Sequence, residues 1–139
     1  MKTKQDAQEA AELLRREFGL AMPVEIKWTA RERNGRAYAY PGFTIIEIGP
    51  NVWRGIEACF LHEFAHVLAC RSAPLDLIRP HGSEYFQALV DIVRAWYGNL
   101  TAYPWDTEYR MLSRWAFQKG YSQKRRDPLP RRSRVIWNS

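Results

Sequence analysis

Two histidines and a glutamate stand at a spacing that suits a catalytic metal. The segment His62-Glu63-Phe64-Ala65-His66 places two imidazoles four residues apart. Positions i and i+4 of a helix lie one turn apart on the same face, so both rings can bind one zinc ion. Glu63 then flanks the ion and can accept a proton from a zinc-bound water. The motif predicts metal ligands at His62 and His66 and a general base at Glu63, the alternative being histidines that only pack on an amphipathic helix.

A third ligand is expected further along the chain, because a catalytic zinc usually takes three protein ligands and one water. The third and last histidine of the sequence, His81, follows His66 by 15 residues, across a segment that contains prolines. His81 is the favoured third ligand. Glu84 is the alternative, as in zinc sites with two histidines and a glutamate. The alternative role for Glu84 is to cap backbone N–H groups at the start of a helix.

The run His81-Gly82-Ser83-Glu84-Tyr85, placed after the first motif, resembles the second motif of the SprT-like zinc metallopeptidase family. That motif reads HGxxF or HGxxW, with an apolar residue one turn later; Tyr85 takes the aromatic position here and Leu89 the apolar one. The resemblance covers about residues 5–98. It implies zinc as the cofactor, His81 as the third ligand, and a substrate strand beside a sheet edge. Many family members carry a C-terminal zinc ribbon, which this chain with two cysteines cannot build.

Hydrophobic periodicity predicts the elements that must position these residues. Apolar residues at three- and four-residue spacing predict helices, and alternating segments bounded by turn residues predict a three-stranded antiparallel meander. The helices are expected over residues 4–18, 54–71, 82–97 and 105–118, and the strands over residues 24–28, 36–40 and 44–48. The predicted fold class is therefore α+β, and the SprT-like resemblance implies a zincin-like minimal metallopeptidase core.

The net charge of +6 resides in the C-terminal tail. Seven basic residues and one acidic residue follow Gln118, whereas residues 1–118 hold fourteen of each. We therefore divide the chain into a SprT-like metallopeptidase domain, residues 1–120, and a basic tail, residues 121–139. Clustered Lys and Arg bind nucleic-acid phosphates without regard to sequence. Residues 119–134 are thus a candidate nucleic-acid contact, the alternative being a solvated charged end.

The N-terminus and the cysteines indicate a compartment. The N-terminus lacks the apolar region of a secretory signal, and no segment approaches the ~18 apolar residues of a membrane span. We expect a cytoplasmic protein without a membrane partner. Cys59 and Cys70 lie eleven residues apart on one expected helix, about 16 Å, which is too far for a disulfide. They are expected to be free thiols that pack as small buried residues, rather than soft metal ligands or redox sensors.

The predicted reaction is zinc-dependent hydrolysis of peptide bonds in flexible or unfolded proteins, or in one particular regulatory protein. Candidates for stabilising the oxyanion of the tetrahedral intermediate are Tyr38, Tyr40 and Tyr85. The alternative function is a nucleic-acid-binding or structural module in which zinc only stabilises the fold. Such a zinc has four protein ligands, so Cys70 or Glu84 would then close the fourth position.

Overall fold

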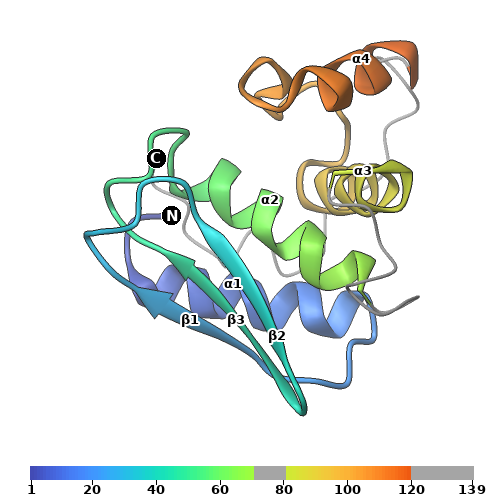
Figure 1. Ribbon diagram of the computed structural model, residues 1–139. Coiled ribbons are helices and arrows are strands. Elements are labelled where there is room, and N and C mark those ends of the chain that lie inside the picture. The colour runs from blue at the N-terminus through green and yellow to red at the C-terminus, as the bar shows by residue number, and fades with distance from the viewer. Residues whose placement is uncertain (71–80, 120–139) are drawn as a thin grey trace.

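The computed structural model describes residues 1–70 and 81–119, which form an α+β fold around a small mixed sheet (Figure 1). This confirms the predicted fold class at the level of α+β. The elements in chain order are α1 Lys4–Glu17, β1 Val24–Trp28, β2 Arg36–Tyr40, β3 Phe43–Ile48, α2 Ile56–Ala69, α3 Ser83–Tyr97, the 3-10 helix η2 Trp105–Thr107 and α4 Arg110–Lys119.

Helix α1 forms where its caps and its apolar stripe coincide. Thr3 and Asp6 make a capping box: the Thr3 hydroxyl accepts from the Asp6 backbone N–H, and the Asp6 carboxylate accepts from the Thr3 N–H. This satisfies backbone donors that the first turn of a helix leaves unpaired. The buried face consists largely of alanines, so the helix backbone lies close to β1.

The sheet has the strand order β1-β3-β2, so the prediction of an antiparallel meander is wrong. β2 and β3 do form an antiparallel hairpin, but β1 pairs with β3 in parallel, with Ile26 opposite Ile46. The physical reason is connection length. Pro41-Gly42 closes a tight turn, whereas residues 29–35 between β1 and β2 are long enough to carry β2 to the far side of β3. Two-residue turns enforce antiparallel neighbours and longer links do not.

The two edges of the sheet differ in how their backbone hydrogen-bonding groups are occupied. On the outer edge of β1, the Gln8 side chain of α1 donates to the Val24 carbonyl at 2.9 Å and accepts from the Ile26 N–H at 3.1 Å. These contacts occupy backbone groups that an edge strand would otherwise present to another chain. β2 forms the opposite edge. The edge available for pairing with a further strand is therefore that of β2.

The elements pack in layers with α2 at the centre (Figure 1). Helices α1 and α2 cover one face of the sheet, where Ile26, Ile46 and Ile48 are buried, and the other face carries a Lys27–Glu47 ion pair of 2.9 Å. Helix α3 packs on the side of α2 away from the sheet, and α4 packs on α3. Because neighbours surround α2, most of its residues are buried, including His62 and Glu63.

The single helix predicted over residues 105–118 is divided in the structure. The 3-10 helix η2 ends at Thr107, Glu108 is extended with φ −82° and ψ 169°, and α4 begins at Arg110. Trp105 is buried and donates its indole N–H to the Leu100 carbonyl at 2.7 Å, while Glu108 turns inward to bury its carboxylate. These tertiary contacts override the local helical periodicity, and they bring Glu108 to α2.

Candidate metal centre

Three imidazoles converge between α2 and the start of α3. The three-histidine cluster (His62, His66 and His81) brings one nitrogen from each ring within 4.8 Å of the others. The Nε2 atoms of His62 and His81 are 3.2 Å apart. A tetrahedral zinc with N–Zn bonds of about 2.0–2.1 Å places two of its nitrogen ligands about 3.3 Å apart. The donor set therefore suits a divalent metal ion, and the His62–His81 pair has the spacing that such an ion requires.

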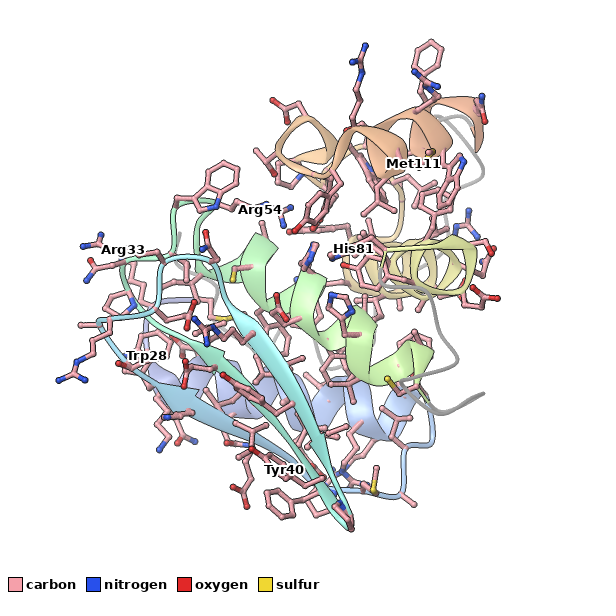
Figure 2. All side chains as sticks on the ribbon, in the orientation of Figure 1. Trp28, Arg33, Tyr40, Arg54, His81 and Met111 are labelled. Atoms are coloured by element: carbon pink, nitrogen blue, oxygen red, sulfur yellow. The ribbon has the colours of Figure 1, made fainter. Side chains whose placement is uncertain are left out.

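His81 reaches the cluster through an uncommon backbone conformation. Its φ of 56° makes it the residue other than glycine with positive φ in the part of the chain that the structure describes. Positive φ is sparsely populated for residues with a Cβ, and it is frequently retained where function requires it. Gly82 then caps α3 from an extended conformation. Figure 2 shows His81 between α2 and α3, which is the position that the ligand role requires.

The His66 and His81 rings are in the neutral state that a metal ion binds. Burial lowers the pKa of His66 to about 3, and the neighbouring histidine charges of His62 and His81 add to the effect. Burial also lowers the pKa of His81 to about 4, with His62 contributing. Both imidazoles are therefore neutral at physiological pH. A metal binds the lone pair of a neutral imidazole and must displace a proton from a charged one.

Glu63 lies on α2 next to these ligands and is only 5% exposed. Burial raises the pKa of its carboxyl group to about 8, the charges of Glu32 and Glu108 add to the rise, and Arg54 opposes it. A divalent cation beside the carboxyl group favours its ionised form. Metal binding and the proton-accepting state of Glu63 are thus coupled.

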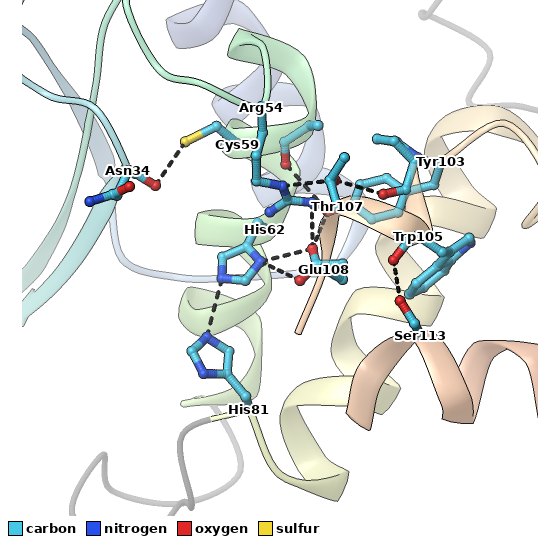
Figure 3. Close-up of polar contacts among 12 residues, drawn as sticks. Asn34, Arg54, Cys59, His62, His81, Tyr103, Trp105, Thr107, Glu108 and Ser113 are labelled. Atoms are coloured by element: carbon cyan, nitrogen blue, oxygen red, sulfur yellow. Dashed lines mark hydrogen bonds and ion pairs between the residues drawn. The ribbon is translucent and has the colours of Figure 1, made fainter. Parts of the chain in front are cut away.

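The turn before β2 is pressed against α2 beside Glu63. Glu32 Oε1 accepts from the backbone N–H groups of Asn34 and Gly35 at 3.1 and 3.0 Å, and the Cys59 thiol donates to the Asn34 carbonyl at 3.4 Å (Figure 3). Gly35 has a φ of 79°, and a Cβ there would lie 2.3 Å from Cys59 Sγ and 3.2 Å from Glu63 Cγ. Glycine is therefore required at this contact.

A Gly35→Ala variant is expected to lose about 1–3 kcal/mol of unfolding free energy through steric crowding, in addition to the conformational cost of placing alanine at positive φ. Gly42→Ala is the matched control, because Gly42 has a φ of 89° and open space around its Cβ position. The measurement is urea unfolding of both variants. Equal losses would show that the contact with α2 contributes nothing.

Both cysteines are free, as expected. Cys59 is buried, and burial raises the pKa of its thiol to about 12. Cys70 is partly buried, and burial raises the pKa of its thiol as well. A protonated thiol is a poor metal ligand, and neither cysteine belongs to the three-histidine cluster. Glu84, the alternative third ligand, is exposed on α3 and also lies outside that cluster.

Glu108 is a residue of the site that sequence reasoning missed. Its side chain is fully buried, and its two carboxylate oxygens lie 2.8 and 3.0 Å from His62 Nδ1 (Figure 3). Arg54 Nη2 lies 2.7 Å from Oε1, and the Tyr103 hydroxyl donates to the same oxygen. Burial opposes ionisation, but hydrogen bonding from His62 and the charges of His62 and Arg54 bring the pKa of Glu108 down to about 2. No spacing rule links positions 62 and 108; an acidic residue within an aromatic stretch was the available signal.

The three tyrosines expected as oxyanion candidates lie in two different environments. Tyr85 is buried and donates its hydroxyl to the His62 carbonyl at 2.9 Å, so that hydroxyl is already committed. Tyr38 and Tyr40 are cross-strand partners of Ile45 and Phe43, which places them on the face of β2 away from α2. Tyr109, which sequence reasoning did not select, packs against His81 with ring centroids 4.1 Å apart and ring planes tilted by 35°, and it is 58% exposed.

A cavity of about 930 Å³ opens beside the cluster. The three-histidine cluster and Glu63 form part of its wall, and Ala37 and Ala39 line it from β2. Because these two alanines face α2 with small side chains, space remains between the edge strand and α2. Its apolar lining includes Leu20, Met22, Trp53, Val67 and Tyr109. The arrangement places an open cavity next to the three-histidine cluster.

Comparison with protein families, curated proteins and solved structures gives no match. Within residues 1–70 and 81–119, no helix has both the length and the apolar character that crossing a membrane requires. The predicted basic tail, residues 121–139, lies outside the described residues, so the predicted nucleic-acid contact stays a prediction.

Proposed function

We propose that this chain is a zinc-dependent endopeptidase of the HExxH type. The three-histidine cluster would hold the metal, and Glu63 would act as general base. The observation that carries the proposal is the meeting of three imidazole nitrogens within 4.8 Å of one another beside a buried glutamate, in the wall of an open cavity. The SprT-like resemblance and a zincin-like fold are part of this proposal.

The ligand chemistry supports zinc in a catalytic site. Imidazole nitrogens suit zinc, copper, iron and nickel, whereas calcium and magnesium prefer oxygen ligands. Among the described residues the cluster supplies three protein ligands. A structural zinc site is closed by four protein ligands, and a catalytic site keeps one position for water or substrate. Three histidines with a cavity beside them favour the catalytic type over the alternative structural module.

The chain's own residues supply the acid–base chemistry. When bound, zinc lowers the pKa of a coordinated water to about 7 and polarises a carbonyl group. A carboxylate oxygen of Glu63 accepts a proton at the start of the reaction and returns it to the nitrogen of the leaving amine. His62, His66 and His81 would hold the metal and take no part in these proton transfers. The buried position of Glu63 limits proton exchange with bulk water between these two transfers.

The cavity and the edge strand β2 support a proposal for the form of the substrate. An extended peptide can add to the edge of a sheet through main-chain hydrogen bonds, and the edge strand β2 runs along the cavity. The apolar lining favours apolar substrate side chains. A folded protein hides both its extended backbone and its apolar side chains. The proposed substrates are therefore flexible or unfolded protein segments.

The test is cleavage of a chemically unfolded protein, compared with the same protein in its folded form. The zinc-loaded chain is expected to cleave the unfolded form at internal peptide bonds and to leave the folded form intact. A chelator should abolish cleavage, and added zinc should restore it. Stoichiometric zinc binding without any cleavage would reject the proposal and favour the structural module instead.

A further inference from the structure

We infer that Glu108 is a positioning residue of the metal centre, which acts by orienting the His62 ring for metal binding. The inference rests on the proposed metal site, and it assigns a role to the segment that follows α3. The ligands and the base all lie within residues 62–81, and the SprT-like resemblance ends near residue 98. Glu108 lies beyond both.

The hydrogen bond between Glu108 and His62 defines which ring nitrogen is free. An ionised carboxylate only accepts hydrogen bonds. Both oxygens of Glu108 face Nδ1 of His62 at 2.8 and 3.0 Å, so Nδ1 must carry the proton. An imidazole that binds a metal is neutral and has one N–H group, which leaves the lone pair on Nε2. Nε2 is the atom that faces His81 at 3.2 Å. The contact with Glu108 thus directs the metal-binding nitrogen of His62 into the cluster.

Glu108 is itself held by a network that is anchored at α2. Arg54, immediately before α2, contacts Glu108 Oε1 at 2.7 Å and the Thr107 hydroxyl at 2.9 Å. The Tyr103 hydroxyl donates to the same carboxylate oxygen and lies 3.4 Å from the Ala58 carbonyl of α2. The side chain of Glu108 is 0% exposed and that of Arg54 is 8% exposed. Figure 3 shows these groups gathered on the side of His62 opposite His81.

A carboxylate behind a histidine is a common arrangement at metal sites. A carboxylate that accepts from the distal nitrogen of a ligating histidine fixes its tautomer and raises its basicity as a ligand. A buried carboxylate is costly unless donors satisfy it, and here three side chains donate to Glu108. Arg54 and Tyr103 therefore allow an ionised carboxylate to persist behind His62.

The experiment compares zinc affinity by chelator competition in the full chain and in Glu108→Gln. Glutamine keeps the shape of the side chain, but its amide can offer an N–H to Nδ1 and so permit the wrong tautomer. The expected result is a zinc dissociation constant about 10–100-fold higher than that of the wild type. Asp106→Asn is the matched control, because Asp106 is an exposed acid two residues away; its affinity should not change. Wild-type affinity in Glu108→Gln would overturn the inference.

Double variants separate a positioning role from a merely structural one. In a His62→Ala background, Glu108→Gln should cause no further loss of zinc affinity, because the ring through which Glu108 acts is gone. In a Glu63→Gln background, which keeps the three-histidine cluster, it should still cause a loss. An equal further loss in both backgrounds would show a general structural effect and overturn the inference.

A measurement on the wild type covers the case in which the variants do not fold. Nitrogen NMR spectra of the metal-free chain with labelled histidine should show a proton on Nδ1 of His62, and a proton on Nε2 with none on Nδ1 would overturn the inference. Failure of the two proposals can be told apart. Zinc binding without peptidase activity rejects only the proposed function, whereas equal zinc affinity of the wild type and Glu108→Gln rejects only the role of Glu108. A wild type that binds no zinc rejects both.

Discussion

Replacing Glu63 with glutamine is expected to lower kcat for cleavage of an unfolded substrate by about 10²–10⁴-fold, the usual contribution of a general base. The amide keeps the volume of the buried side chain but cannot accept a proton from water at neutral pH. Zinc should still bind, because Glu63 is not one of the three clustered ligands. The measurements are kcat and KM, together with the zinc content of each purified protein.

The matched control is Glu84→Gln, which makes the same chemical change at an exposed position on α3. Its activity and zinc content should equal those of the wild type. Full activity of zinc-loaded Glu63→Gln would refute the role of Glu63 and with it the proposed mechanism. Equal loss in both variants would point to an effect of net charge instead.

The same variant offers a readout that does not depend on activity. Burial raises the pKa of Glu63 from 4.5 to about 8 in the metal-free fold, so the folded state binds more protons than the unfolded state between these pH values. The stability contributed by protonated Glu63 is present below pH 4.5 and is lost as pH rises through about 8. The unfolding free energy of metal-free wild type should therefore fall relative to that of Glu63→Gln over this window. Parallel pH profiles of the two proteins would contradict the buried environment of Glu63.

Zinc is expected to stabilise the wild-type fold, and removal of one histidine of the cluster should abolish most of that effect. A ligand at 100 times its Kd stabilises the folded state by about 2.7 kcal/mol. In a domain of this size the gain raises Tm by several degrees. His66→Ala removes one of the three proposed ligands, and the Tm of this variant should hardly respond to zinc. Thermal melting with and without zinc, after chelator treatment, provides the measurement.

The choice of third ligand follows from two further variants in the same assay. His81→Ala should lose the zinc-dependent rise in Tm, whereas Glu84→Ala should keep it, because Glu84 is exposed and lies outside the three-histidine cluster. Comparing each variant with its own metal-free form removes differences in basal stability. A normal zinc response in His81→Ala, with loss in Glu84→Ala, would make the glutamate the ligand.

Local features of the site could be predicted from the sequence, because they depend on residues that are neighbours along the chain. A helix places positions i and i+4 on one face whatever surrounds it, and His62 and His66 accordingly lie in one cluster on α2. The same reasoning located α1, α3 and the three strands to within a few residues. Proline and glycine marked their ends. The motif His81-Gly82-Ser83-Glu84-Tyr85 also directed attention to His81, which the structure places in the cluster.

Contacts between distant segments were decided only by the tertiary structure. The strand order β1-β3-β2 depends on where a seven-residue link carries β2, and alternation of side chains is the same in a parallel and an antiparallel pair. The division of the last helix, and the turn of Glu108 toward His62, depend on burial of Trp105 and on donors from Arg54 and Tyr103. Periodicity along the chain carries no information about a partner 46 residues away. Such a partner is selected by the need to satisfy a buried charge once the core has formed.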